Sequence, residues 1–360
     1  MTGLNFKYSF LMLSASIFSL LSCVQPKNNH SEDLLTSTKL LTIKFPDQLI
    51  KPKIIDSQKI FESIGYIPLE TTQTSRFSEI NQLEVTQNHL VVLDRGTSAI
   101  LVFLKNGKFQ FKITASSIRE FSINEVTDQI VFQDNYLGQT FRYDFTGKLL
   151  EAWTTPFVHS AHVFVDSTHR AFYRYFVDKR DVGKFSNSNI VISDQAGAIS
   201  NGFLSYDTSA INFREVLNPD KQFYKSNGTT YFIQPYVNRI YRIESDKLIA
   251  DFNLNFEEKY KLPDSFLTDK RYLRHRLDYF QDNPQKIALV RDFYIVDSML
   301  AFKALASNWY DIILYDLKTR ESLSAYQLGS SPANNNLPLG TSFIAADTTS
   351  FYRFVAAKDL

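Results

Sequence analysis

Three histidines that lie close together in the sequence are the first residues with the chemistry of a metal site. His159, His162 and His169 are separated by three and seven residues, and imidazole nitrogens are common ligands of zinc. No cysteine or acidic ligand pattern accompanies them, and the segment has the character of β-strands, in which residues three apart face opposite sides. The sequence therefore favours structural roles for these histidines and predicts no metal site.

Aspartates recur near the ends of predicted strands, at Asp94, Asp134 and Asp316. Short acidic side chains in such positions accept hydrogen bonds from backbone N–H groups of the following turn. The alternative is that they converge on a ligand or a calcium ion at a central channel. The sequence favours the turn interpretation and identifies no ligand-binding residue.

Motifs of the common enzyme classes are missing from the chain. It contains no G-x-S-x-G elbow, H-E-x-x-H, Walker loop or G-x-G-x-x-G. The segment 193–200 is similar to the Asp box of sialidases, but its spacing differs and it occurs once. We therefore predict no catalytic residue and no cofactor, and favour a protein without catalytic activity.

The N-terminus has the pattern of an export signal. Lys7 is followed by an apolar stretch of signal-peptide length, and the run LLSC, which ends at Cys23, resembles the lipobox of bacterial lipoproteins, with Leu21 where a smaller residue is commoner. The resemblance implies that residues 1–22 are a lipoprotein signal peptide and that Cys23 carries acyl chains, which bind the bilayer. Residues 23–39 form a polar, flexible tether. We expect an exported, membrane-anchored lipoprotein of the cell envelope, such as the outer membrane, at its periplasmic face or on the cell surface.

The composition limits the remaining function classes. With 39 basic and 38 acidic residues, the chain gives no sign of binding nucleic acid. Cys23 is the single cysteine, so no intramolecular disulfide can form. The 31 Phe and 19 Tyr residues, with abundant Ile, Val and Thr, are typical of strands and favour an all-β fold.

A hairpin pattern repeats along the chain. Strands are predicted at 89–94, 99–104 and 108–113, and Asn106-Gly107 between the last two is a strong hairpin signal. The same pattern returns in residues 129–153, where Gly147 lies 40 residues after Gly107. Fainter copies follow at 169–206, 229–254 and 293–328. A period of about 40 residues with several strands per unit is typical of propeller blades.

The two ends of the chain supply further strands. Residues 342–357 offer two strands, and residues 40–45 and 63–70 offer two more. A blade built from both termini closes the ring and leaves no free sheet edge. The prediction is a single six-bladed β-propeller over residues 40–360, whose last blade is closed by N- and C-terminal strands, with residues 64–70 paired to the C-terminal strands.

The first repeat carries a family resemblance. Residues 60–113 resemble the opening of the bacterial six-bladed β-propeller lipoprotein family, in which a hydrophobic-P-L-E-T-T segment precedes a hydrophobic-L-D-R turn and a V-F-x-x-x-G-K-F strand pair. The matching residues are Pro68, Leu69, Glu70, Thr71, Thr72, Leu93, Asp94, Arg95, Val102, Phe103, Gly107, Lys108 and Phe109. The Gly-rich run that many members carry next is replaced here by residues 114–121. The resemblance implies a propeller in the cell envelope, but no uniform activity.

One segment breaks the β pattern. Residues 257–284 predict a helical insertion, with Asp269 as the N-cap of a helix from Lys270 to Phe280. Its basic run, Lys270, Arg271, Arg274, His275 and Arg276, is interpreted as a solvated helix face rather than an anion site.

The leading functional hypothesis is a lipid-anchored, non-catalytic binding module for a glycan, a peptide or an envelope protein. Trp153, Trp309 and Tyr310 are candidates for a docking surface or, in the simpler interpretation, for core packing. The alternative is a propeller-type hydrolase or lyase with a carboxylate or calcium site at the channel mouth.

Overall fold

The computed structural model describes residues 40–45, 54–154, 159–174, 184–194, 197–205, 221–272, 275–329, 339 and 342–356. Ser31–Leu360 is one compact unit. Cys23 and the predicted signal and tether lie outside the described residues. Within the described part of the chain, no helix has both the length and the apolar character that crossing a bilayer requires.

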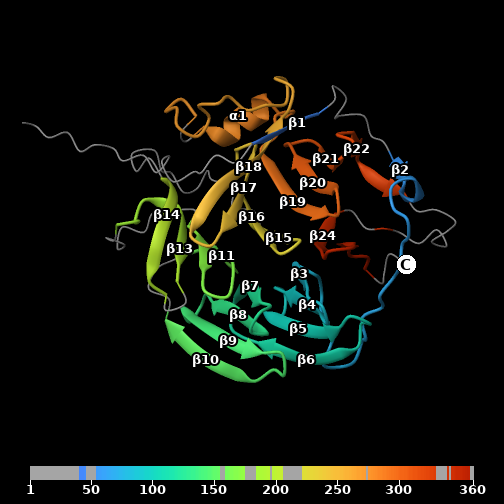
Figure 1. The fold of residues 1–360 in the computed structure, drawn as a ribbon, viewed down its shortest axis with the longest axis vertical. Coiled ribbons are helices and arrows are strands. Elements are labelled where there is room, and N and C mark those ends of the chain that lie inside the picture. Colours follow the sequence, from blue (N-terminus) through green and yellow to red (C-terminus); the bar gives the residue numbers. More distant parts are fainter. Residues whose placement is uncertain are drawn as a thin grey trace, which may run out of the picture. The chain divides into compact units, whose positions relative to one another are not determined.

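Five sheets recur along the described residues, each with four antiparallel strands consecutive in sequence, and we call them blades 1 to 5 (Figure 1). Blade 1 consists of β3 (Gln82–Val85), β4 (His89–Asp94), β5 (Ala99–Leu104) and β6 (Phe109–Thr114). Blade 2 consists of β7 (Ile118–Asn124), β8 (Gln129–Asp134), β9 (Gln139–Asp144) and β10 (Leu149–Thr154). Blade 3 consists of β11 (Ala161–Phe164), β12 (Arg170–Tyr173), β13 (Ser188–Ser193) and β14 (Ile199–Ser205). Blade 4 consists of β15 (Phe223–Ser226), β16 (Thr229–Ile233), β17 (Arg239–Glu244) and β18 (Lys247–Asn255). Blade 5 consists of β19 (Leu289–Val296), β20 (Met299–Leu305), β21 (Tyr310–Asp316) and β22 (Ser322–Ala325).

The predicted hairpins are confirmed in blades 1 and 2. Gly107 and Gly147 occupy equivalent turns, between β5 and β6 and between β9 and β10, with φ angles of +86° and +84°. Glycine adopts this left-handed conformation without the steric cost that a Cβ atom brings. The spacing of these two glycines therefore marked a true structural repeat.

The blades form a β-propeller because their first strands contact one another in succession. β7 contacts β11, β11 contacts β15, β15 contacts β19, and the two-stranded sheet of β24 (Phe343–Ala346) and β25 (Phe351–Arg353) lies next, with β24 against both β19 and β3. Gln82 on β3 joins the circle to β7 by exchanging two hydrogen bonds with the backbone of Phe121, at 2.8 and 3.1 Å. Figure 1 shows these first strands toward the centre of the ring.

Apolar clusters hold most neighbouring blades together. One cluster joins blades 1 and 2, a second joins blades 3 and 4, and a third joins blades 4 and 5. A further cluster packs blade 1 against β24 and β25. Among the described residues, no apolar cluster spans blades 2 and 3, which sets this interface apart from the others.

The N-terminal segment does not pair as predicted. Residues 64–70 form no strand; instead, the Glu70 amide donates to the Gly107 carbonyl (2.9 Å) and the Glu70 carboxylate accepts from the Phe109 amide (2.8 Å). The prediction that this segment pairs with the C-terminal strands is therefore wrong. The physical reason is that the β5–β6 hairpin of blade 1 already provides hydrogen-bond partners for this segment, so it does not pair with the C-terminal strands.

The earlier N-terminal strands cover other edges. β1 (Leu41–Lys44) adds a parallel strand to β18 of blade 4, and β2 (Ile54–Asp56) pairs in parallel with β23 (Gln327–Gly329), which follows blade 5. A one-turn 3-10 helix, Ser57–Lys59, follows β2. Phe61 then packs edge-on against Phe343 and Phe351 of the two-stranded sheet, with ring centroids 6.2 Å apart in each case. The N-terminal segment thus meets the C-terminal sheet through side chains.

The insertion lies between blades 4 and 5 as predicted, but its helix is shorter. α1 (Arg276–Asp282) has seven residues, and Asp269 accepts hydrogen bonds from the Arg271 amide and guanidinium rather than capping a helix from Lys270. Tyr236, Leu262, Phe266 and Phe280 form a small apolar cluster beneath the insertion. The predicted helix start is wrong because the amides of Tyr272 and His275 bond to carbonyls three residues earlier, in successive tight turns, and the helix begins only at Arg276.

Candidate functional site

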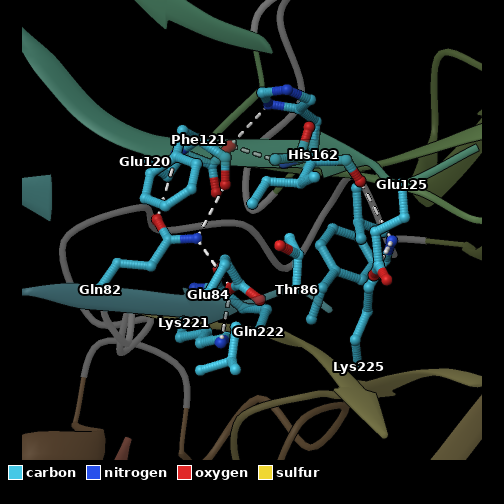
Figure 2. A pocket seen from close by; sticks show the side chains of 15 residues that line it. Gln82, Glu84, Thr86, Glu120, Phe121, Glu125, His162, Lys221, Gln222 and Lys225 are labelled. Carbon is cyan, nitrogen blue, oxygen red and sulfur yellow. Dashed lines mark hydrogen bonds and ion pairs between the residues drawn. The ribbon is translucent and has the colours of Figure 1, made fainter. Parts of the chain in front are cut away.

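The centre of the ring is filled by polar side chains that satisfy one another (Figure 2). Lys221 Nζ lies 2.9 Å from Glu84 Oε1, which also accepts from the Gln82 amide at 3.0 Å. Lys225 Nζ donates to the Ile123 carbonyl at 3.1 Å and lies 3.7 Å from Glu125. The cavity that remains among them has a volume of about 30 Å³.

Such a volume holds one or two water molecules and no organic ligand. The carboxylates at this position are paired with lysines or hydrogen-bonded, so they do not form an open group of acidic ligands. The arrangement counts against the alternative of a hydrolase or lyase site at the channel.

A much larger cleft lies between blades 2 and 3. It has a volume of about 570 Å³, in the range of ligand-binding pockets. Its walls include Arg142 and Trp153 from blade 2 and His162, Arg170 and Phe172 from blade 3. Thr140, Ser167, Thr168 and Ser193 also line it. The interface without a shared apolar cluster is thus the one that opens into a cleft.

Arg170 occupies the middle of this cleft wall. Its guanidinium lies 5.6 Å from the centroid of Trp153 and 5.6 Å from that of Phe172, which are cation–π distances. The Arg142 guanidinium also lies near the Trp153 ring, 5.8 Å from its centroid, and forms an ion pair with Glu151. Burial and the neighbouring Arg142 charge lower the pKa of Arg170, and the charges of Asp194 and Glu151 act in the opposite direction. A guanidinium remains charged at neutral pH.

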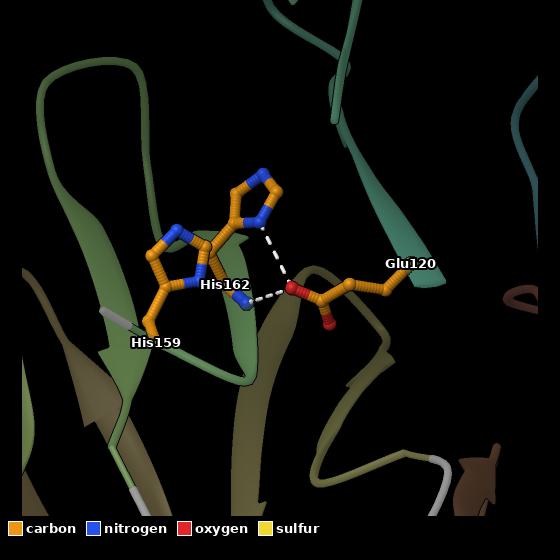
Figure 3. A group of neighbouring side chains, drawn as sticks. All are labelled: Glu120, His159 and His162. Atoms are coloured by element: carbon orange, nitrogen blue, oxygen red, sulfur yellow. Dashed lines mark hydrogen bonds and ion pairs between the residues drawn. The ribbon is translucent and has the colours of Figure 1, made fainter. Parts of the chain in front are cut away.

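A buried cluster of Glu120, His159 and His162 lies at the inner end of the same interface (Figure 3). Glu120 Oε1 accepts from the His162 amide at 2.6 Å and lies 3.0 Å from His162 Nδ1. The His159 and His162 rings meet edge to face, with centroids 5.4 Å apart. One ligand atom from each of the three residues lies within 4.8 Å of the other two.

Burial shifts the pKa of each of the three groups toward its uncharged form. Burial, with Arg170 as a second cause, lowers the pKa of His162 to about 3, and burial together with His162 lowers the pKa of His159 well below its usual value. Burial also raises the pKa of Glu120 well above its usual value, although the His162 amide and the Arg95 charge oppose the rise. At neutral pH both imidazoles are therefore unprotonated.

The structure separates the histidines that the sequence grouped. His169 lies at the start of blade 3's second strand, where its Nδ1 contacts the Asp166 carboxylate at 2.9 Å, and it is no part of the cluster. The expectation that His159 and His162 face opposite sides is wrong, because β11 begins at Ala161 and His159 precedes the strand. The strand alternation rule does not apply to a residue outside the strand.

Glu120 is the member of the cluster that sequence reasoning missed. It lies on β7, one repeat earlier in the chain, where the pairing with β8 is irregular between Ile118 and Phe121. Such bulges turn a side chain away from its regular direction. The bulge could not be read from the sequence, although the repeat period places 120 and 159 at similar positions of consecutive blades.

The recurring aspartates are confirmed as turn residues. Asp94 accepts from Ser78, Gly96 and Thr97. Asp134 accepts from the amides of residues 116, 136 and 137, and Asp316 from those of 318 and 319. Asp94 and Asp134 also tie their turns to the segment before the blade's first strand, through Ser78 and Ser116. Hydrogen bonding lowers the pKa of all three aspartates, against burial.

The remaining candidates do not form a common site. In the basic run, Arg276 is buried against Tyr236 and Phe266, Arg271 pairs with Asp269 and His275 contacts Asp278, while Arg274 lies outside the described residues. Trp309 packs against Tyr260, and Tyr310 stacks on Tyr326. Of the three aromatic candidates from the sequence, Trp153 alone lines the cleft.

Fold and site together define a β-propeller with a ligand-sized cleft between two of its blades. The chain belongs to the family described as Domain of unknown function (DUF4934), which matches residues 40–360. No curated protein matches the sequence significantly.

One solved structure shares this fold over most of both chains. A Bacteroides fragilis protein described as exported is 16% identical, with a TM-score of 0.66 over 81% of this chain and 86% of that one. Streptogramin B lyase is 14% identical, with a TM-score of 0.39 over 69% and 68% of the two chains. The WD40 repeats of RRP9 are 10% identical, with a TM-score of 0.38 over 76% and 70%. At these identities the likeness concerns the fold alone.

Proposed function

We propose that this protein is an exported, lipid-anchored β-propeller of the cell envelope that binds an acidic glycan, without catalysis, in the cleft between blades 2 and 3. The anchor is the acylated Cys23, and residues 23–39 tether the propeller to the membrane. A short acidic peptide is the competing ligand class, and the binding experiment below separates the two.

The observation that carries the binding proposal is the position of Arg170. Its guanidinium lies between two aromatic rings and faces the cleft, and no carboxylate lies within ion-pair distance of it among the described residues. A cation held in this way is pre-positioned for a carboxylate, sulfate or phosphate group. The surrounding hydroxyls and the Trp153 ring suit the polar edges and apolar face of a sugar.

The experiment is a direct binding measurement on a panel of glycans and peptides. We expect acidic glycans to bind and their neutral counterparts to bind at least tenfold more weakly. Arg170→Gln and Trp153→Ala should each lower the affinity by about 1–2 kcal/mol, or roughly 5- to 30-fold. Arg271→Gln, a change of an exposed arginine on the insertion, is the matched control and should bind like the unaltered protein.

Equal binding of acidic and neutral glycans, or equal affinity of the Arg170→Gln and Arg271→Gln proteins, contradicts the proposal. Binding of acidic peptides with no glycan binding contradicts the ligand class while leaving the cleft as the site.

The export and anchor proposal is supported by the run LLSC before Cys23 and by the exported description of the Bacteroides fragilis relative in fold. A Cys23→Ala change should move the protein from the membrane fraction to the soluble fraction. Retention of the Cys23→Ala protein on the membrane would show that another element anchors it.

We also infer that β24 and β25 form a reduced sixth blade. The support is that β24 contacts the first strands of both blade 5 and blade 1, as a blade in that position would. Deleting residues 342–360 should then abolish the single cooperative unfolding transition, because it opens the ring. An unchanged transition would mean that the five larger blades are sufficient.

A further inference from the structure

The cluster of Glu120, His159 and His162 has a composition that its surroundings do not explain. Side chains of His159 and His162 are buried, at 8% and 4% residue exposure, in a part of the fold where apolar clusters fill every neighbouring interface. Buried polar groups normally complete their hydrogen bonds within the protein. His162 Nε2 is buried and has no hydrogen bond of good geometry among the described residues.

The geometry of the cluster matches what a metal ion requires. Two imidazole nitrogens and one carboxylate oxygen lie within 4.8 Å of one another, and they come from two different blades. Nitrogen and oxygen ligands at about 2.0–2.2 Å from a common ion are themselves about 3–3.5 Å apart. His162 Nδ1 and Glu120 Oε1, at 3.0 Å, are already close to this spacing, and the ligand atom of His159 lies within 4.8 Å of both other ligand atoms.

The position of the cluster leaves room for further ligands. His159 and His162 line the cleft between blades 2 and 3, while Glu120 and His162 line the small central cavity. The cluster is therefore part of the wall that separates the two spaces. An ion held by three protein ligands there keeps at least one coordination position open toward the cleft.

We propose that Glu120, His159 and His162 bind one divalent transition-metal ion of the zinc type at the interface of blades 2 and 3. Two imidazoles and a carboxylate suit Zn²⁺, Fe²⁺, Ni²⁺ or Cu²⁺, whereas Ca²⁺ and Mg²⁺ require oxygen ligands in larger number. The ion bridges a residue of blade 2 to two residues of blade 3. It thereby takes the place of the apolar cluster that this interface lacks.

The proposal is tested with the metal alone, so its outcome is independent of the glycan proposal. The mature, tag-free chain is stripped with a chelator and titrated with Co²⁺, which gives visible absorption bands on tetrahedral binding, and then with Zn²⁺ as a competitor. We expect one ion per chain by elemental analysis after dialysis. An anomalous difference map at the zinc edge should place the ion among the three side chains.

Two variants and one control make the test specific. Glu120→Gln is nearly isosteric and keeps an oxygen that accepts from the His162 amide, so its fold should be retained, yet its affinity should fall by about 10- to 100-fold or more. His162→Ala should lose binding in the same way. His169→Ala is the matched control, because His169 also contacts a carboxylate but lies outside the cluster.

The control should bind Zn²⁺ like the unaltered protein. Circular dichroism and urea unfolding of each metal-free variant report whether it folds. The proposal is overturned if the unaltered protein gives no Co²⁺ spectrum, if Zn²⁺ affinity is unchanged in a folded Glu120→Gln protein, or if His169→Ala loses as much affinity as His162→Ala.

Discussion

Replacing Gly107 by alanine tests how the N-terminal segment is attached to the propeller. Gly107 has a φ of +86° in the turn between β5 and β6, and a Cβ atom there would lie 2.1 Å from the Pro68 carbonyl oxygen. No real Cβ contact is that short, so residues 67–70 must move away. The movement removes the Glu70 amide bond to Gly107 and the Phe109 amide bond to the Glu70 carboxylate.

Two glycines in comparable turns provide controls. Gly147 has a φ of +84°, and its new Cβ would meet only the side chain of Phe111, at 3.0 Å, which can rotate. Gly138 has a φ of +68° and would meet nothing within 4 Å. Alanine in the left-handed conformation costs about 1–2 kcal/mol at all three positions.

The cost of alanine in the left-handed conformation can be separated from the loss of the contacts made by residues 67–70. Gly138→Ala and Gly147→Ala should lower the free energy of unfolding by about 1–2 kcal/mol each. Gly107→Ala should lower it by about 2 kcal/mol more, because two further hydrogen bonds at about 1 kcal/mol each are lost. Urea unfolding followed by tryptophan fluorescence measures all three. Equal losses in the three proteins would refute the docking of residues 67–70 on the blade 1 hairpin.

Three further predictions concern the charges of Asp311 and Asp347 and the contact of Phe61 with the β24–β25 sheet. Burial raises the pKa of Asp311 from 3.8 to about 6. The folded protein therefore holds this proton more tightly than the unfolded chain, and the free energy of unfolding falls as the pH rises from about 4 to 6. Asp311→Asn should raise the urea midpoint of unfolding at about pH 7.5 but not at pH 4. Burial acts to raise the pKa of Asp347, but Lys105 and Tyr352 outweigh it and lower that pKa, so the stability this group contributes is present above pH 3.8 and is lost as the pH falls. Lys105→Met should therefore cost about 1 kcal/mol at neutral pH and less at pH 3, whereas an equal loss at both would show that the ion pair contributes nothing. Phe61→Ala should lower the free energy of unfolding by about 2 kcal/mol, because it removes apolar contact with the β24–β25 sheet. An unchanged thermal unfolding midpoint would exclude that contact.

The blades were predictable because their signals are local. Asn106-Gly107 and its counterpart Gly147 fix turn conformations within a few residues, and the strands β4 and β5 are short apolar runs whose side chains are nearly all buried. Aspartates such as Asp94 cap their own turns. The turn contacts themselves follow from residues close in sequence, so one chain is enough to recognise them, although the bonds of Asp94 to Ser78 reach 16 residues back.

The pairing partners of the N-terminal strands were not predictable, because these contacts are long-range. β1 pairs with β18 and β2 with β23, far along the sequence and in parallel. A short apolar strand such as Leu41–Lys44 fits any sheet edge of suitable pattern, and its sequence does not specify which one. The insertion shows the same limit on a smaller scale, since Asp269 accepts from the Arg271 amide as a cap would, yet the following residues form tight turns and the helix begins at Arg276.

The candidate site depends on this kind of long-range contact. His159 and His162 are near in sequence, but Glu120 joins them through a bulge in the preceding blade, and Trp153 meets Arg170 across two blades. Sequence spacing alone does not identify which side chains meet between repeats. It could show that the repeats exist, and therefore that residues one period apart are candidates for contact.

The interface of blades 2 and 3 joins the stability of the propeller to its proposed ligands. Without a shared apolar cluster among the described residues, this interface is held near the axis by the Glu120–His162 contact and stays open farther out. Opening one interface between blades breaks the closed ring and removes the constraint that closure places on the other interfaces. The weakest interface therefore limits the stability of the whole propeller. A ligand that binds only the closed ring adds about 2.7 kcal/mol to its stability at a concentration of 100 times Kd. Blades 2 and 3 should therefore show the fastest amide hydrogen exchange at their interface in the free protein, and the greatest protection when Zn²⁺ or an acidic glycan is bound.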